Sequence, residues 1–210
     1  HEENMLLSAQ HTHSGPGGYS HYGLYNITIP GFVPEVYQQL VTGIVDAIVE
    51  AWSKLKPAKI FLESAEFEPD VPVAFNRSMK AYLSNPEATG ADPKASHMAL
   101  DRKMSLLRFE GLDGTQIGAV NWFGVHTTSV HNDNHSICWD NKGYAADFLE
   151  QEIRTSPGGS QFVGAFAQGV AGDVTPNFVW DTKKKWTRGR FEDDFESARD
   201  NGRMQYTLAK

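Results

Sequence analysis

Three histidines stand at positions where strands are expected to end. His11 and His13 lie two positions apart directly after the apolar run Met5–Ala9, which we expect to be a short buried strand. In extended backbone, residues two apart point to the same side, so both imidazoles can serve one site, as two ligands or as one ligand and one base. His126 follows a second expected strand. The pattern alone leaves open whether these are site residues or ordinary surface and core histidines.

Zinc binding is one chemistry that this residue set allows. The single cysteine, Cys138, excludes a disulfide within the chain and a cysteine-based zinc site. Histidine nitrogens and carboxylate oxygens remain as ligands, and a catalytic zinc keeps one position open for a water whose pKa falls toward 7. Two histidines from separate strand ends, with further ligands, would form such a site. His131 and His135 lie in a polar loop and are expected at the surface.

The charge of the chain argues against nucleic acid as a partner. The net charge is -7 over 210 residues, whereas phosphate binding needs a basic face. We interpret the basic run 183–185 as a solvated loop; contact with a membrane or lipid headgroups is the less favoured interpretation. No apolar run approaches the ~20 residues needed to span a bilayer.

The N-terminus gives no localisation signal of its own. The chain opens on polar and acidic residues without a signal peptide and without an initiator Met, so we expect the protein's own N-terminus to lie upstream. Glycosylation triplets begin at Asn26, Asn76 and Asn134. They favour a secreted glycoprotein only weakly, because such triplets arise easily by chance.

Apolar periodicity predicts an α/β fold around these histidines. Apolar residues at helical spacing predict helices at 34–55 and 144–154, and the polar segment 191–210 is also expected to be helical. Strands are expected at 59–65, 104–109, 116–123 and 162–167. An Asp113-Gly114 turn joins the middle pair of strands into a hairpin. The stretch 66–100 is expected to be irregular. We therefore expect a mixed sheet with flanking helices and a site at the strand ends.

Four segments together resemble the neutral (non-lysosomal) ceramidase family, in the family's order and at compatible spacing. The likeness runs from about residue 4 to 210. The segments are His11-Thr12-His13-Ser14-Gly15-Pro16-Gly17-Gly18, Phe75-Asn76-Arg77-Ser78, Asp140-Asn141-Lys142-Gly143-Tyr144-Ala145 and Gly172-Asp173-Val174-Thr175-Pro176-Asn177.

The resemblance implies zinc-dependent hydrolysis of the ceramide amide to sphingosine and a free fatty acid. By that resemblance, His11 and His126 match zinc ligands, and His13 matches a histidine that accepts or delivers a proton near the zinc-bound water. Arg77 matches the arginine that contacts the substrate carbonyl or oxyanion. Thr175 stands where the family typically has serine, and we expect it to position substrate and not to act as the nucleophile.

The resemblance also implies that the chain is incomplete as a catalytic unit. The family's zinc site takes a glutamate and a tyrosine from a later part of the chain, and no matching motif is found here. We therefore expect residues 1–210 to be the N-terminal portion of a catalytic domain, lacking the rest of that domain and a C-terminal β-sandwich domain. That missing part is then a required partner, and the fragment alone should have low or no activity.

The expected setting is a sphingolipid substrate, peripheral membrane contact, and a full-length protein that is secreted or membrane-associated. Two alternatives stay open: a zinc amidase for another N-acyl lipid, and an inactive fragment that serves as an interaction module.

Overall fold

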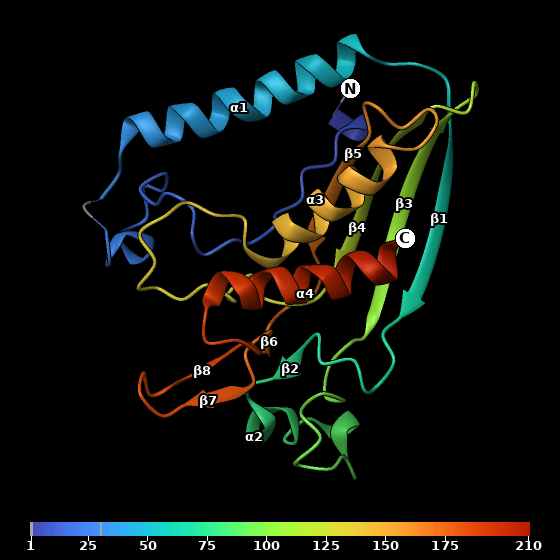
Figure 1. The fold of residues 1–210 in the computed structure, drawn as a ribbon. Coiled ribbons are helices and arrows are strands. Elements are labelled where there is room, and N and C mark those ends of the chain that lie inside the picture. Colours follow the sequence, from blue (N-terminus) through green and yellow to red (C-terminus); the bar gives the residue numbers. More distant parts are fainter. Residues whose placement is uncertain (1, 30) are drawn as a thin grey trace. The chain divides into compact units, whose positions relative to one another are not determined.

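A four-stranded sheet in the order β1-β3-β4-β5 forms the centre of the larger part of the chain (Figure 1). The computed structural model describes residues 2–29 and 31–210. β1, β3 and β4 are antiparallel neighbours, and β5 pairs with β4 in parallel, so the predicted mixed sheet is confirmed. The bounds are Ala58–Glu66 for β1, Lys103–Gly111 for β3, Gln116–Phe123 for β4 and Val163–Gln168 for β5.

The hairpin between β3 and β4 follows from its turn residues. Gly114 has a φ of 84°, a conformation that L side chains rarely adopt. Its N–H donates to the carbonyl of Gly111 at 2.9 Å. The expected Asp113-Gly114 turn is therefore present.

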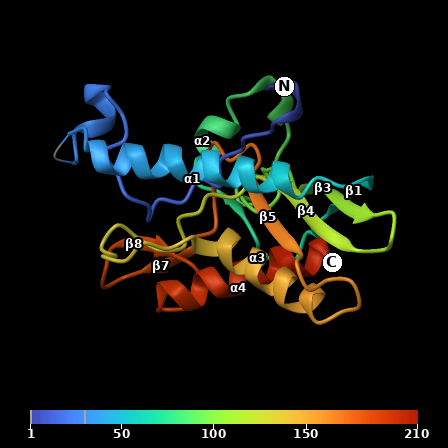
Figure 2. The same cartoon turned by 90° about the horizontal axis from the view of Figure 1, so that it is seen from above.

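The parallel pairing of β4 and β5 needs a crossover, which α3 (Asp140–Arg154) supplies. α3 packs against α4 (Asp194–Ala209) and β5, and both helices lie on the same side of the sheet (Figure 2). Both helices were expected, but α3 begins four residues before the expected position. The carboxylate of Asp140 accepts the N–H of Asn141, which satisfies one of the free donors of the first turn.

The opposite face of the sheet carries apolar side chains. Register places Ile60 beside Phe109, and Leu62 beside Leu107, on that face. Ile60 and Leu62 are 65% and 74% exposed, and Val163 on β5 is 58% exposed.

Residues 15–57 form a second compact unit, separate from the unit that contains the sheet. Its main element is α1 (Pro34–Ser53), which confirms the helix expected at 34–55. Proline suits the first helical turn because the N–H groups of that turn have no carbonyl acceptor within the helix, so the N–H that proline lacks is not missed. Among the described residues, none of the helices is both long and apolar enough to cross a membrane.

Two sequence expectations fail in the segments around the sheet. Met5–Ala9 is not a strand: Met5, Leu6 and Leu7 are exposed, and one backbone bond, from Gln168 N to Ala9 O at 2.8 Å, ties the run to the end of β5. Residues 66–100 contain short elements besides irregular backbone. The short elements of the described chain are Glu2–Asn4, Gly23–Asn26, β2 (Phe75–Asn76), α2 (Met79–Tyr82), Pro86–Ala88, β6 (Val174–Thr175), β7 (Val179–Asp181) and β8 (Trp186–Arg188).

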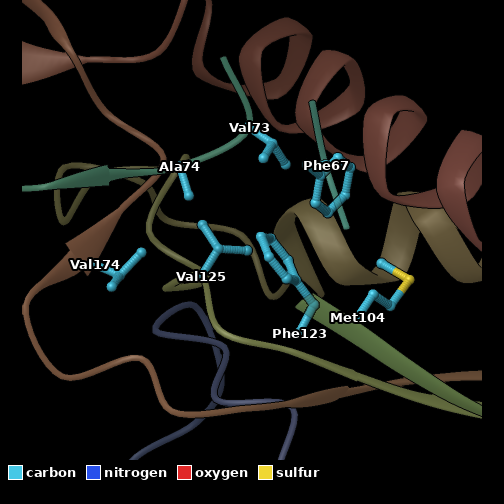
Figure 3. Packing of buried hydrophobic residues seen from close by; sticks show 7 residues of the cluster. All are labelled: Phe67, Val73, Ala74, Met104, Phe123, Val125 and Val174. Carbon is cyan, nitrogen blue, oxygen red and sulfur yellow. The ribbon is translucent and has the colours of Figure 1, made fainter. Parts of the chain in front are cut away.

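One apolar cluster lies behind the segments that carry the predicted site residues. Its buried members are Phe67, Val73, Ala74, Met104, Phe123, Val125 and Val174 (Figure 3). Val125 directly precedes His126, and Val174 directly precedes Thr175. Ala74 lies three residues before Arg77. Packing of these neighbours therefore sets where the three polar residues emerge.

Candidate metal centre

The segment that carries His11 and His13 is fixed against the chain that follows β4. Thr12 forms a parallel β-bridge with Thr127, and His13 N donates to Thr127 O at 3.4 Å. The Thr127 hydroxyl in turn donates to the carbonyl of His11. His11 has a φ of 75°, which is uncommon for a residue with a side chain. The bridge thus places His11 and His13, on either side of Thr12, close to His126, which precedes Thr127.

One carbonyl group, that of Val174, contacts both the ring and the backbone N–H of His126. Its ring Nδ1 lies 2.8 Å from Val174 O, and its backbone N–H donates to the same oxygen at 3.3 Å. Because a carbonyl can only accept, Nδ1 carries the proton and Nε2 is left with a free lone pair. This is the usual way in which a protein prepares a neutral imidazole to bind a metal. The residue is 7% exposed.

The three imidazoles form one cluster. His11 and His13 have ring centroids 4.6 Å apart, and the His126 centroid lies 4.9 Å from His11 and 5.6 Å from His13. One nitrogen from each ring can be chosen so that all three lie within 4.8 Å of one another. Such a set of donors is compatible with one metal ion.

The electrostatic surroundings keep two of these rings neutral. Burial, followed by the charge of Arg77, lowers the pKa of His126 despite the opposing hydrogen bond to Val174. The pKa of His13 is lowered by partial desolvation of its ring, and then by His11, His126 and Arg77. Neutral imidazole is the form that binds a metal.

A short two-stranded sheet brings Arg77 and Thr175 to the same region. β2 pairs with β6 so that Phe75 faces Thr175 and Asn76 faces Val174. Arg77 follows directly; its backbone N–H donates to Asp173 O at 2.9 Å, and its guanidinium lies 3.4 Å from Gly172 O.

Thr175 is buried, and its hydroxyl is already in use. The residue is 6% exposed, and its Oγ1 accepts the backbone N–H of Asn177 at 3.1 Å. The hydroxyl hydrogen remains available for a second partner. Beside it, Phe75 and Phe178 stack with ring centroids 4.4 Å apart. All five predicted site residues thus lie on connected segments, with the three histidines in mutual contact.

Other predicted features lie elsewhere. His131, expected at the surface, is largely buried: it stacks on Trp186 with centroids 4.5 Å apart, and its ring nitrogens lie 2.9 Å from the Asp194 carboxylate and from Thr187 O. This expectation was wrong because the β7–β8 hairpin, which brings Trp186 to it, gave no clear signal in the sequence. The glycosylation triplet at Asn76 is also misleading, because that side chain is buried and donates to Ala99 O at 3.0 Å.

The chemistry of the donor set fits zinc. Three imidazole nitrogens suit zinc better than magnesium or calcium, which prefer oxygen ligands. Within the described part of the chain, the cluster contains no carboxylate. A catalytic site of the usual kind needs three protein ligands and an open position.

Known proteins resemble this chain over nearly its whole length. A family profile described as neutral/alkaline non-lysosomal ceramidase, N-terminal, matches residues 1–210. Neutral ceramidase from Pseudomonas aeruginosa is 39% identical over 208 residues, which are 99% of this chain and 29% of that protein. Neutral ceramidase B from Dictyostelium discoideum is 40% identical over 207 residues, 97% of this chain and 27% of that protein.

Solved structures show the same fold at this level of identity. The crystal structure of the Pseudomonas aeruginosa neutral ceramidase superposes with a TM-score of 0.80 at 39% identity, covering 97% of this chain and 30% of that one. A structure described as ceramidase complexed with C2 gives a TM-score of 0.82 at 38% identity. The chain spans under a third of these relatives. It belongs to the neutral/alkaline non-lysosomal ceramidase family and corresponds to that family's N-terminal part.

Proposed function

We propose that this chain supplies part of the active site of an enzyme that hydrolyses the amide bond of ceramide to sphingosine and a free fatty acid. The observation that carries the proposal is the convergence of His11, His13 and His126 from two distant segments. Membership of the ceramidase family supports the substrate class.

Zinc is the cofactor that we propose, held by Nε2 of His126 and a ring nitrogen of His11. The hydrogen bond from His126 Nδ1 to Val174 O supports this, since it leaves Nε2 free to bind. When bound, zinc polarises a carbonyl and lowers the pKa of a water toward 7. Further ligands would come from outside residues 1–210, in the region that corresponds to the remaining two thirds of the relatives.

The other residues of the cluster divide the remaining tasks. His13 takes and delivers protons, since its lowered pKa leaves a free base at neutral pH. Arg77, whose guanidinium is tethered to Gly172 O, stabilises the negative charge that develops on the amide oxygen. Thr175 donates a hydrogen bond to substrate while its oxygen accepts from Asn177.

Zinc content and turnover test the proposal together. Zinc would be measured by mass spectrometry in the chain alone and in the chain joined to the segment that corresponds to the rest of its relatives. We expect stoichiometric zinc and release of fatty acid from N-acylsphingosine in the joined protein. His126→Ala should lose the metal, whereas Lys80→Ala, at an exposed position, should not. Absence of zinc from both preparations would contradict the proposed enzymatic function.

An amidase for a different N-acyl lipid is the second candidate. The threonine at position 175 favours it, because its additional methyl group is buried beside the substrate-facing hydroxyl. Comparing kcat/KM for N-acylsphingosine with that for simpler N-acyl amides separates the two. An interaction module without catalysis is the outcome if neither preparation binds zinc.

A further inference from the structure

The motif Asp140-Asn141-Lys142 has no role in the chemistry proposed above, although it is polar and completely buried. The three residues are 2%, 0% and 0% exposed. They are the first three residues of α3. Burying polar groups is unfavourable unless each finds a partner. Their partners identify what the motif does.

Asn141 holds the backbone of His126. Its Nδ2 donates to His126 O at 3.0 Å and to Ser129 Oγ at 3.1 Å. Its Oδ1 accepts from Gln205 Nε2 at 3.0 Å. The amide group thus has both donors and its acceptor occupied, which fixes its orientation. Asn141 therefore fixes the backbone carbonyl of the residue whose ring belongs to the histidine cluster.

The neighbouring residues hold the same loop on either side. The carboxylate of Asp140 accepts the N–H groups of Ser129 and Val130 at 3.2 and 2.8 Å. The side-chain nitrogen of Lys142 donates to Phe123 O at 2.9 Å. Three successive side chains therefore bind the chain before, at and after His126.

A second layer joins this loop to the segment that leads to Arg77. Gln205 also donates to Asn201 Oδ1 at 2.8 Å. Asn201 Nδ2 donates to Val73 O at 2.7 Å, four residues before Arg77. Gln205 and Asn201 are 0% and 4% exposed.

Stability alone does not account for so many buried polar groups. Well-packed apolar residues of similar volume are often as good as, or better than, a buried polar network. Such a network fixes one geometry, because each hydrogen bond that is lost leaves a buried group unpaired.

We propose that Asn141, oriented by Gln205, is a positioning residue that holds His126 in the orientation in which it binds the metal. This inference rests on the proposed zinc site. It gives a function to a motif that identified the family but was assigned no role in the reaction.

The test compares the Zn²⁺ affinity of Asn141→Asp with that of the parent protein, which is the chain joined to the segment that corresponds to the rest of its relatives. Affinity is measured by competition with a chromophoric chelator. Aspartate has nearly the same shape, but it cannot donate to His126 O. We expect affinity to fall by about 10- to 100-fold, as for other groups that orient metal ligands. With Co²⁺ in place of Zn²⁺, the visible absorption bands should shift, because the orientation of one ligand changes.

Gln205→Met is the second variant, since a buried aspartate can prevent folding. It removes the donor to Asn141 without adding charge, and the same loss of affinity is expected, of smaller size. Leu149→Ala is the control. Leu149 is buried on α3, the helix that carries Asn141, and it packs in the apolar cluster that contains Phe162 and Phe166. Its thermal midpoint should fall while its Zn²⁺ affinity stays that of the parent protein.

The outcomes are distinct. If the parent protein binds Zn²⁺ and both variants bind it equally well, the inference is wrong and the proposed function stands. If Leu149→Ala weakens binding as much as the other variants, the effect is general destabilisation and the inference is likewise wrong. A parent protein that binds no Zn²⁺ overturns the metal site and the inference with it.

Discussion

The Nε2 atoms of His11 and His13 are 3.2 Å apart, and this distance has two chemical readings. One ring can donate a hydrogen bond to the other. Alternatively, both nitrogens can bind one ion, since zinc–nitrogen bonds of about 2.0–2.1 Å in tetrahedral geometry place two ligands ~3.3 Å apart. The division of roles between the two histidines is therefore the sharpest question at the residue scale.

His13→Gln answers it. If His13 transfers protons, the variant keeps its zinc and loses turnover by about 10²- to 10⁴-fold. Metal content and amide hydrolysis are measured on the same preparation. His11→Gln is the matched change two residues away, and we expect it to lose zinc. Loss of zinc from His13→Gln would instead make His13 a third ligand.

Thr175 allows a similar separation. Thr175→Ser keeps the hydroxyl, so we expect zinc content and turnover close to those of the parent. Thr175→Ala leaves the Asn177 N–H without its acceptor, which should lower the free energy of unfolding by about 1–3 kcal/mol. Turnover should fall but persist, and zinc should stay. Complete loss of activity in Thr175→Ala, with an acyl group trapped on Thr175 in the parent, would make this residue the nucleophile.

At the scale of elements, the contact between α3 and α4 depends on Gly202. A Cβ at this position would lie 2.5 Å from Asn141 O and 2.9 Å from Ala145 N. These are backbone atoms, so the helices would have to separate. We expect Gly202→Ala to lower the free energy of unfolding by about 1–3 kcal/mol, measured by urea denaturation.

Gly43→Ala is the matched control because it is the same substitution inside α1. Nothing lies within 4 Å of a Cβ there. Alanine should therefore stabilise the helix by up to about 1 kcal/mol. The two substitutions have opposite expected signs, and destabilisation by both would argue against close packing as the cause.

Elements with a repeating apolar pattern were the ones that the sequence predicted. The helices α1 and α3 and the β3–β4 hairpin are confirmed because their apolar patterns extend over several turns or residue pairs. The strand predicted at Met5–Ala9 is absent. A short apolar run does not show whether a neighbouring strand is there to pair with it. The pair β2–β6 was not predicted, since two-residue strands depend on contacts across about a hundred positions of sequence.

The family resemblance named candidate site residues, but it did not give their arrangement. Nothing local to His126 shows that Val174 O will orient its ring, because that contact spans 48 positions. Likewise, Gln205, which donates to the side chain of Asn141, lies on a different helix. Family resemblance supplied the candidate residues, whereas tertiary packing supplies their geometry.

At the scale of the whole molecule, the buried Lys142 makes stability depend on pH. Burial lowers its pKa to about 7 from an ordinary value of 10.5. Between these values the unfolded chain binds more protons than the folded one, so the free energy of unfolding should rise with pH. The rise should be on the order of a few kcal/mol and should be absent from Lys142→Met.

Urea denaturation at several pH values across that window measures the effect. Lys80→Met, at an exposed position, should keep the pH dependence of the parent. Asp140 contributes with the opposite sign just above its ordinary pKa of 3.8, because burial raises its pKa. A flat profile in the parent would mean that the pKa of Lys142 in the folded state stays near its ordinary value of 10.5.

The bridge between Thr12 and Thr127 has a consequence for the unfolded chain. His11 and Thr127 are 116 positions apart, so a metal shared by His11 and His126 would cross-link the chain around a very long loop. Closing a loop of ~100 residues removes entropy worth up to about 4–5 kcal/mol from a denatured chain. The ion would thus act as a reversible substitute for a disulfide in a chain whose one cysteine has no partner.

Chelation tests this consequence. Zinc removal should lower the thermal midpoint of the parent protein and leave His11→Gln unchanged, because that variant has no cross-link to lose. The thermal midpoints are measured by calorimetry. Equal changes in the two proteins on zinc removal would exclude a metal cross-link between His11 and His126. A metal site of this kind makes the first residues of the chain and the end of β4 fold as a single unit.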